Sequence, residues 1–118
     1  MEIRNVADCP EYVAPDDAIA QELCGHNGLK AEAQSMARII IPPGVTVEEH
    51  HHIKAEEVYY IASGRGRMFL DGETREMGPG DAVVIRPGQR HSITNLLEEN
   101  LEMVVTCSPP WHPDDQIF

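Results

Sequence analysis

Gly44-Val-Thr-Val-Glu-Glu-His50-His51-His52-Ile-Lys-Ala-Glu56-Glu57 is the stretch of this 118-residue chain from which the fold can be argued. Side chains alternate between the two faces of a strand, so His50 and His52 share a face and His51 points away. Two imidazoles at this spacing can chelate one ion. Glu57 opens the next apolar run and reaches the same point if the intervening residues turn the chain back. The same histidines are also compatible with a solvated surface patch that binds metal loosely.

A third imidazole comes from a distant part of the chain. His91 follows the turn dipeptide Pro87-Gly88 and opens another short apolar run. In a closed barrel, this run can bring His91 to the two earlier histidines. Three neutral imidazoles and one carboxylate suit a divalent transition metal and leave coordination positions open. Iron, manganese, nickel, zinc, cobalt and copper all fit this donor set.

Short apolar runs separated by turn signals fill the chain from about residue 33 onward. Each has roughly four to seven residues and is rich in β-branched and aromatic side chains, which favours strands over helices. Asp71-Gly72 suits a type I′ hairpin turn. The pattern predicts an all-β fold, an antiparallel sandwich or barrel. The runs are residues 36–41, 57–62, 67–70, 73–77, 82–86, 91–95 and 101–107.

The two ends of the chain carry weaker signals. Residues 16–24 fit a helix capped by Asp16 or Asp17 and by Gly25, or a strand that leads into the barrel, and we favour the strand. The proline-rich tail, residues 108–118, is expected to be irregular, with Trp111 packed across the outside of the barrel or on a partner subunit.

The spacing of glycines, histidines and Glu57 resembles the two motifs of the cupin superfamily. Arg86 stands where the family usually has proline, which leaves the turn glycine and the spacing to His91 intact. The resemblance implies a single-domain double-stranded β-helix (jelly roll), with a barrel core over residues 29–107 and an N-terminal extension over residues 1–28. It also implies that the metal ligands are His50, His52, Glu57 and His91. The first motif is carried by Gly44, His50, His52, Glu57 and Gly64, and the second by Gly80, Pro87, Gly88, His91 and Asn95.

Several side chains are candidates for a substrate pocket beside the ligands. Tyr59 shares a strand face with Glu57 and is a candidate base for proton abstraction, as is a hydroxide on the metal. Met36 and Arg38 share one face of their run, and Met103 lies on the last run. Alternation leaves open which of these faces is inward. A buried Arg38 would need a carboxylate or an anionic substrate as its partner.

Other polar residues near the motifs fit structural or solvent-exposed roles. Arg86 and Arg90 flank the second motif and fit solvated rim charges better than an anion site. Asn95 fits a hydrogen-bonding role near the end of its strand. His26 and His112 lie outside the motifs and are expected at the surface.

Charge and composition restrict the partners. Twenty acidic against nine basic side chains give a net charge of −11, which repels nucleic acid and anionic membrane surfaces. No apolar run is long enough to span a bilayer, and the first residues lack a signal-peptide pattern. Three cysteines without CxxC spacing fit reduced, buried thiols in a cytoplasmic protein. Because small barrels expose an apolar sheet face and edge strands, we expect a homodimer.

These features indicate a metal-dependent enzyme that acts on a small oxygenated metabolite, such as a sugar or a keto or hydroxy acid. Isomerase, lyase and dioxygenase chemistry are all compatible with the expected ligands. The alternatives are a non-catalytic cupin that binds a small molecule or a metal, and a barrel whose metal mainly holds the fold together.

Overall fold

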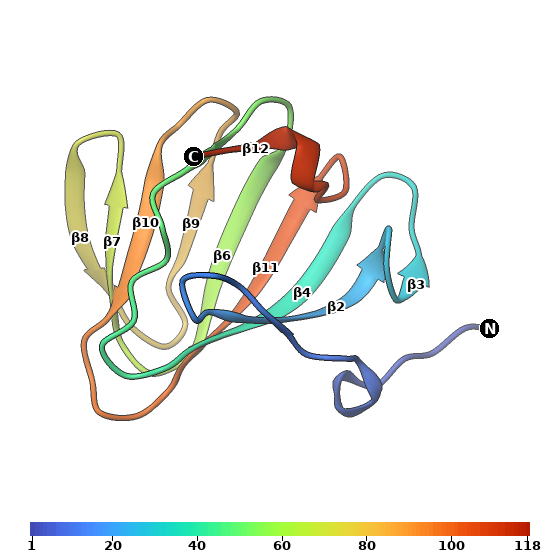
Figure 1. Cartoon of the computed structure of the whole chain (residues 1–118), viewed down its shortest axis with the longest axis horizontal. Coiled ribbons are helices and arrows are strands. Elements are labelled where there is room, and N and C mark those ends of the chain that lie inside the picture. Colours follow the sequence, from blue (N-terminus) through green and yellow to red (C-terminus); the bar gives the residue numbers. More distant parts are fainter.

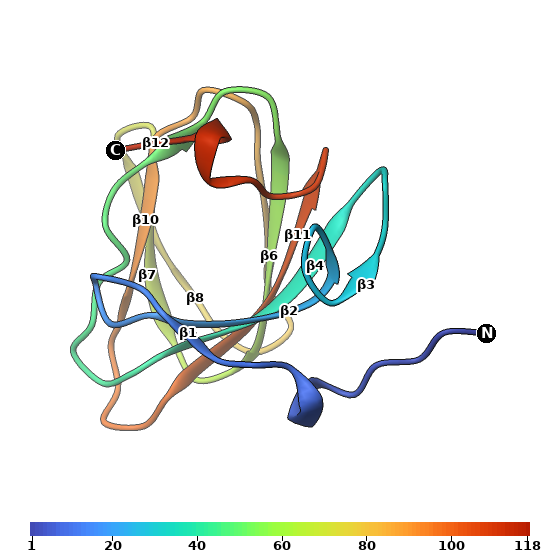
Figure 2. The ribbon, with the colours of Figure 1, turned by 45° about the vertical axis from the view of Figure 1, so that its right-hand side comes forward.

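Two antiparallel sheets face each other and enclose the interior of an all-β double-stranded β-helix, or jelly roll (Figures 1 and 2). The computed structural model describes residues 1–118. The larger, seven-stranded sheet contains, in spatial order, β1 (Tyr12–Val13), β2 (Ile19–Gly25), β4 (Ser35–Ile41), β11 (Leu101–Ser108), β6 (Glu56–Ser63) and β9 (Ala82–Ile85), with β3 (Leu29–Lys30) paired to β2. The smaller sheet contains β10 (His91–Asn95), β7 (Gly66–Leu70) and β8 (Glu73–Met77).

A third, two-stranded sheet lies at the upper end of the barrel in Figure 1. It pairs β5 (His51–His52) with β12 (Gln116–Ile117) from the C-terminal tail. The remaining elements are two short 3₁₀ turns, η1 (Val6–Asp8) and η2 (Pro113–Asp115). Neither turn approaches the length or apolar character of a membrane-spanning helix.

Strand alternation separates the core from the outer faces. On β6, Tyr59 and Ile61 are buried, whereas Tyr60 between them is exposed. Met103 on the neighbouring β11 pairs with Ile61 and is also buried. Burying an apolar side chain of this size contributes roughly 1.5–3 kcal/mol. The fully buried side chains that form the centre of the core are Ile41, Ile61, Ile85, Ile93, Leu101 and Met103.

The predicted strands are confirmed, with boundaries that differ by at most one residue at either end. The ambiguous segment near residues 16–24 is a strand, β2, which pairs with β4. At the β7–β8 hairpin, Asp71 and Gly72 have φ values of 45° and 85°, as the type I′ turn requires.

The C-terminal tail is more ordered than its prolines suggest. It was expected to be irregular, but it contains η2 and β12. In β12, Gln116 pairs with His52 and Ile117 with His51. The tail can form this strand because β5 has a free edge with which it pairs. The local sequence of the tail does not indicate that edge.

Asn95 joins the end of β10 to the neighbouring chain segments. Its Nδ2 donates to the carbonyl oxygens of Ile41 and Glu99, both at 2.8 Å, and its Oδ1 accepts from the Leu97 amide at 2.9 Å. The side chain is buried. Its expected hydrogen-bonding role is therefore confirmed.

Replacing Asn95 should destabilise the barrel. In Asn95→Ala the buried carbonyl of Ile41 loses its donor, and we expect the free energy of unfolding to fall by about 2–3 kcal/mol. Urea denaturation of the two proteins measures this difference. Asn100→Ala, at an exposed position nearby, is the matched control and should be nearly neutral. An equal effect of both variants would contradict this account.

Candidate metal centre

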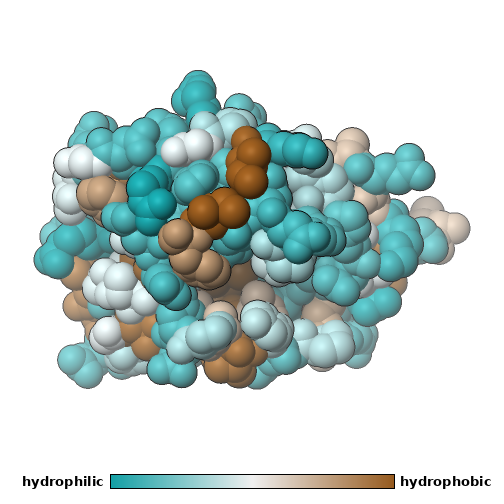
Figure 3. All heavy atoms as spheres, turned by 45° about the horizontal axis from the view of Figure 1, so that its top comes forward, coloured by the Kyte–Doolittle hydropathy of each residue, from teal (hydrophilic) through white to brown (hydrophobic).

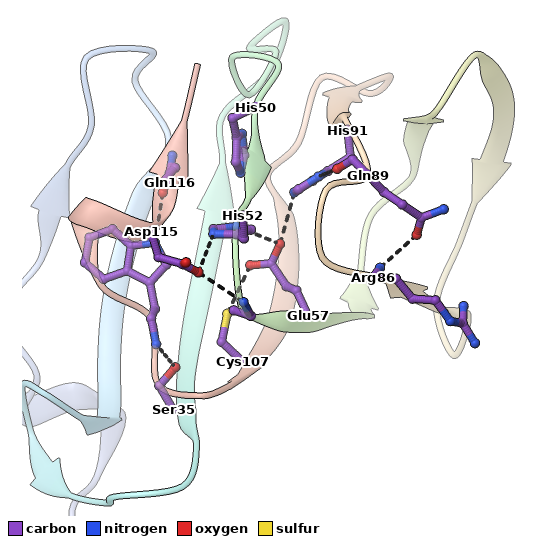
Figure 4. A network of polar contacts seen from close by, with 12 residues as sticks. Ser35, His50, His52, Glu57, Arg86, Gln89, His91, Cys107, Asp115 and Gln116 are labelled. Atoms are coloured by element: carbon purple, nitrogen blue, oxygen red, sulfur yellow. Dashed lines mark hydrogen bonds and ion pairs between the residues drawn. The ribbon is translucent and has the colours of Figure 1, made fainter.

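Four buried side chains converge inside the barrel near its upper end (Figure 4). They are His50 just before β5, His52 on β5, Glu57 at the start of β6 and His91 at the start of β10. Their candidate ligand atoms all lie within 4.8 Å of one another. A pair of backbone hydrogen bonds joins His50 and His91, the two members that lie farthest apart in the sequence. The His50 amide donates to His91 O at 3.1 Å, and the His91 amide donates to His50 O at 2.9 Å.

Two of the three imidazoles are oriented by carbonyl groups of the backbone. Nδ1 of His50 lies 2.7 Å from Glu48 O, and Nδ1 of His91 lies 2.9 Å from Gln89 O. A carbonyl oxygen only accepts, so each Nδ1 carries a proton and each Nε2 presents its lone pair when the ring is neutral. In both cases the contact with the carbonyl two residues earlier orients the ring toward the cluster.

The Glu57 carboxylate lies among the imidazoles. Its Oε1 lies 3.0 Å from His91 Nε2 and 3.3 Å from His52 Nε2. Burial alone would raise the pKa of Glu57, but the adjacent rings of His52 and His91 outweigh it and lower the pKa to about 2. The side chain is therefore an anion at neutral pH. Its second oxygen accepts a hydrogen bond from the Cys107 thiol at 3.3 Å. Burial and the charge of Glu57 raise the pKa of that thiol, which keeps it protonated.

The donor set fits a divalent transition metal. Both ring nitrogens of His52 are buried without a hydrogen-bond partner, although unsatisfied buried nitrogens are costly. When the His91 ring is neutral, its proton lies on Nδ1. The lone pair of Nε2 then points at the Glu57 carboxylate, which is an unfavourable contact. A cation among these atoms would take the lone pairs of both Nε2 atoms, which leaves Nδ1 of His52 as the nitrogen that still lacks a partner. Imidazole and carboxylate donors suit borderline divalent ions.

The structure places Tyr59 beside the cluster and Met103 in the apolar core. The Tyr59 ring is buried and meets the His91 ring edge-on, with 5.8 Å between their centroids. Burial, together with the charge of Glu57, raises the pKa of Tyr59 well above 10. Its phenol is therefore neutral at physiological pH and suits a proton donor better than a base.

Met36 and Arg38, the other two candidates for the substrate pocket, lie on the outer face of β4. Alternation directs Ile39 and Ile41 of that strand toward the core, so Met36 and Arg38 point away from it. The Arg38 guanidinium donates to Gln21 Oε1 through Nε at 3.0 Å and Nη2 at 2.7 Å. These two side chains therefore do not line the interior.

The two arginines near the second motif do not approach the cluster. Arg90 donates from Nε to Glu49 Oε2 at 2.8 Å, and its Nη1 lies 3.3 Å from His51 Nδ1. His51 thus points away from the other histidines, as the alternation predicts. Arg86 is exposed and, in Figure 4, extends away from the four candidate ligands.

Two further residues lie next to the ligands, and the motif spacing identifies neither of them. The position of Cys107 can be inferred from the alternation along β11, because this strand pairs Cys107 with Glu57. Asp115 approaches from the C-terminal tail, with Oδ2 at 4.0 Å from His52 Nδ1. No local pattern in the tail indicates that contact.

Comparisons with known proteins agree with the fold and the cluster. A family model described as a cupin domain matches residues 37–107, and the chain belongs to this family. The chain is 38% identical over 108 residues to an uncharacterized protein of Methanocaldococcus jannaschii, covering 91% of this chain and 86% of that one. It is 32% identical over 82 residues to an oxalate-binding protein of Thermotoga maritima, covering 70% and 68%. A nucleoside dehydratase from Streptomyces shares the fold, with a TM-score of 0.80 and 20% identity over 98% of this chain and 88% of that one.

The buried cluster should make the metal-free protein sensitive to acid. Burial lowers the pKa of His50 from 6.5 to about 4, so between these values the unfolded chain binds a proton that the folded chain does not. Stability therefore falls as the pH is lowered through this window. The His50 contribution is about 2–3 kcal/mol between about pH 7 and about pH 4.5.

Urea denaturation of chelator-treated protein at both pH values measures this effect. Acidification should cost His50→Gln less stability than it costs the wild type, by the amount given above. His26→Gln, at an exposed histidine, serves as the control and should respond like the wild type. An identical acid response of wild type and His50→Gln would show that His50 does not carry the effect.

Proposed function

We propose that the protein is a metal-dependent enzyme that acts on a small oxygenated metabolite, such as a sugar or a keto or hydroxy acid. The observation that carries this proposal is the convergence of His50, His52, Glu57 and His91 in a buried site, with orphaned nitrogens on His52. Isomerase, lyase or dioxygenase chemistry are the reaction classes that we expect from such ligands.

The chain itself supplies binding, orientation and proton transfer. Bound among the four ligands, a divalent transition metal polarises a carbonyl or carboxylate oxygen of the substrate, and a redox-active ion adds electron transfer. Tyr59 holds a proton on its phenol oxygen beside His91 and is the candidate to donate it to the substrate. The apolar side chains of the core close the barrel below the ligands.

We propose that substrates enter from the upper end of the barrel. Figure 3 turns this end toward the viewer and shows hydrophobic side chains in a row beside a hollow, within a mostly hydrophilic surface. Phe118, from the tail, lies near this end with its ring centroid 5.8 Å from that of His50. An apolar rim of this kind suits a small organic molecule that carries its polar groups toward the metal.

A second candidate is a binding protein without turnover. It is favoured by the similarity to the oxalate-binding protein of Thermotoga maritima, at 32% identity. The nucleoside dehydratase from Streptomyces, by contrast, shows that the same fold supports catalysis. The two candidates share the four ligands and differ only in turnover. The three free cysteines fit a reducing compartment, and we propose a cytoplasmic location.

Loss of one ligand should abolish stoichiometric metal binding. Elemental analysis of the purified wild type is expected to give about one transition-metal ion per chain, and His52→Ala and His91→Ala should fall to background. His26→Ala removes an exposed histidine and serves as the matched control with unchanged metal content. Unchanged content in the two ligand variants would refute the site. Metal binding without turnover of a broad panel of keto acids and sugars would favour the binding protein.

We also propose that the protein forms a homodimer through the outer face of the larger sheet. Met36, Tyr60 and Val84 are 39%, 46% and 41% exposed on three strands of this sheet. The register places Thr106 and Val58 between Met36 and Val84 in one row across the face, and Tyr60 lies two residues beyond Val58 on the same face of β6. An exposed apolar row of this kind is typical of an interface.

A charge on this face of the sheet should dissociate the dimer. Sedimentation equilibrium at micromolar concentration is expected to give twice the chain mass for the wild type and the single chain mass for Tyr60→Glu, because a buried unpaired charge is costly. Thr74→Glu on β8 makes the same change of charge on the other sheet and should leave the dimer intact. A monomeric wild type would contradict the proposal.

A further inference from the structure

His52 lacks the local acceptor that orients the other two imidazoles. His50 and His91 each use the carbonyl two residues earlier in the chain. For His52 that group is the carbonyl of His50, and it already accepts the His91 amide at 2.9 Å. Nδ1 of His52 is left buried without a hydrogen-bond partner.

The polar side-chain group that faces this nitrogen comes from the C-terminal tail (Figure 4). Asp115 Oδ2 lies 4.0 Å from His52 Nδ1. The separation is about 1 Å longer than a typical hydrogen bond, so a small movement of the ring or the carboxylate closes it. The Asp115 side chain is 14% exposed, which keeps the interaction largely out of water.

Asp115 is itself held in place by the turn that follows His52. Its Oδ1 accepts from the Lys54 amide at 2.8 Å, its Oδ2 accepts from the Ala55 amide at 3.1 Å, and its carbonyl oxygen accepts from the Ile53 amide at 3.0 Å. This turn connects His52 to Glu57. The carboxylate therefore sits at a fixed position beside two of the four candidate ligands.

The rest of the tail fastens Asp115 from its other side. In β12, the residue that follows Asp115 pairs with His52 across the two-stranded sheet. Trp111 Nε1 donates to Gln116 Oε1 at 2.8 Å, and the Trp111 amide donates to Ser35 Oγ at 2.9 Å. The tail is thus anchored both to β5 and to β4.

We propose that Asp115 is a positioning residue for the metal centre: its carboxylate accepts the Nδ1 proton of His52 and thereby directs Nε2 of that ring toward Glu57 and His91. This inference rests on the proposed metal binding. It makes the C-terminal tail, some 60 residues away in sequence from the first motif, part of the same site.

A charged acceptor has a stronger effect than a backbone carbonyl. A carboxylate that accepts the outer proton of a ligating histidine fixes the tautomer and raises the basicity of the other nitrogen. Loss of such an acceptor typically costs 10- to 100-fold in metal affinity. His52 is thus the imidazole whose affinity for a metal depends on the tail.

The competing explanation is that Asp115 only ties down the turn at residues 53–55. Zinc affinity, measured by competition with a chelator on the full chain, separates the two explanations when it is combined with histidine ring NMR. We expect Asp115→Asn to weaken zinc binding 10- to 100-fold and Asp115→Glu to recover part of the loss. Asp114→Asn changes an exposed neighbouring carboxylate and should bind zinc like the wild type.

The NMR signal of the His52 Nδ1 proton in the zinc-loaded protein is the readout that a turn-stabilising role would not change. In the wild type we expect it to be shifted downfield and protected from exchange with water, and in Asp115→Asn to lose both properties. An Nδ1 proton in the wild type that exchanges as freely as that of an exposed histidine would overturn the inference, even if Asp115→Asn fails to fold. Unchanged zinc affinity in Asp115→Asn would also overturn it. A wild type that binds no zinc would instead refute the proposed function.

Discussion

The carboxylate of Glu57 lies buried beside two imidazole nitrogens, with Oε1 at 3.0 Å from His91 Nε2 and 3.3 Å from His52 Nε2. A buried anion is costly unless positive charge compensates it, and neutral imidazoles with protonated Nδ1 atoms supply lone pairs instead. The barrel therefore brings together a set of donors whose lone pairs and negative charge a cation would compensate. The strands β6 and β10 take this arrangement because their apolar side chains pack in a common core, and backbone hydrogen bonds between His50 and His91 hold the segment before β5 beside them.

Three different devices orient the donors. Backbone carbonyls at Glu48 and Gln89 orient His50 and His91, and the Cys107 thiol holds the second oxygen of Glu57. His52, whose nearest carbonyl is already occupied, faces a carboxylate of the tail instead. The first two devices lie within the barrel, because Glu48 and Gln89 stand two residues before His50 and His91 and Cys107 belongs to β11. The third comes from the C-terminal tail, so the proposed contact of Asp115 with His52 would link metal binding to the position of that tail.

The sequence predicted the strands and the four converging side chains because both depend on local rules, namely alternation, turn residues and motif spacing. It predicted that Met36 and Arg38 share a face, but alternation alone does not say which face is inward, and the structure places both outside. Asp115 could not be anticipated, because its contact with β5 depends on a free strand edge and on how the prolines direct the tail. The Tyr59 phenol also acquires its high pKa only through burial, which no local pattern specifies.

The most direct test is a crystal structure of the protein loaded with zinc, with diffraction recorded on both sides of the zinc absorption edge. The account predicts one strong anomalous peak at about 2.0–2.2 Å from Nε2 of His50, His52 and His91 and from the carboxylate of Glu57. A barrel without a peak at these atoms, or with zinc bound only at the exposed His26 and His112 pair, whose ring centroids lie 5.2 Å apart, would contradict it.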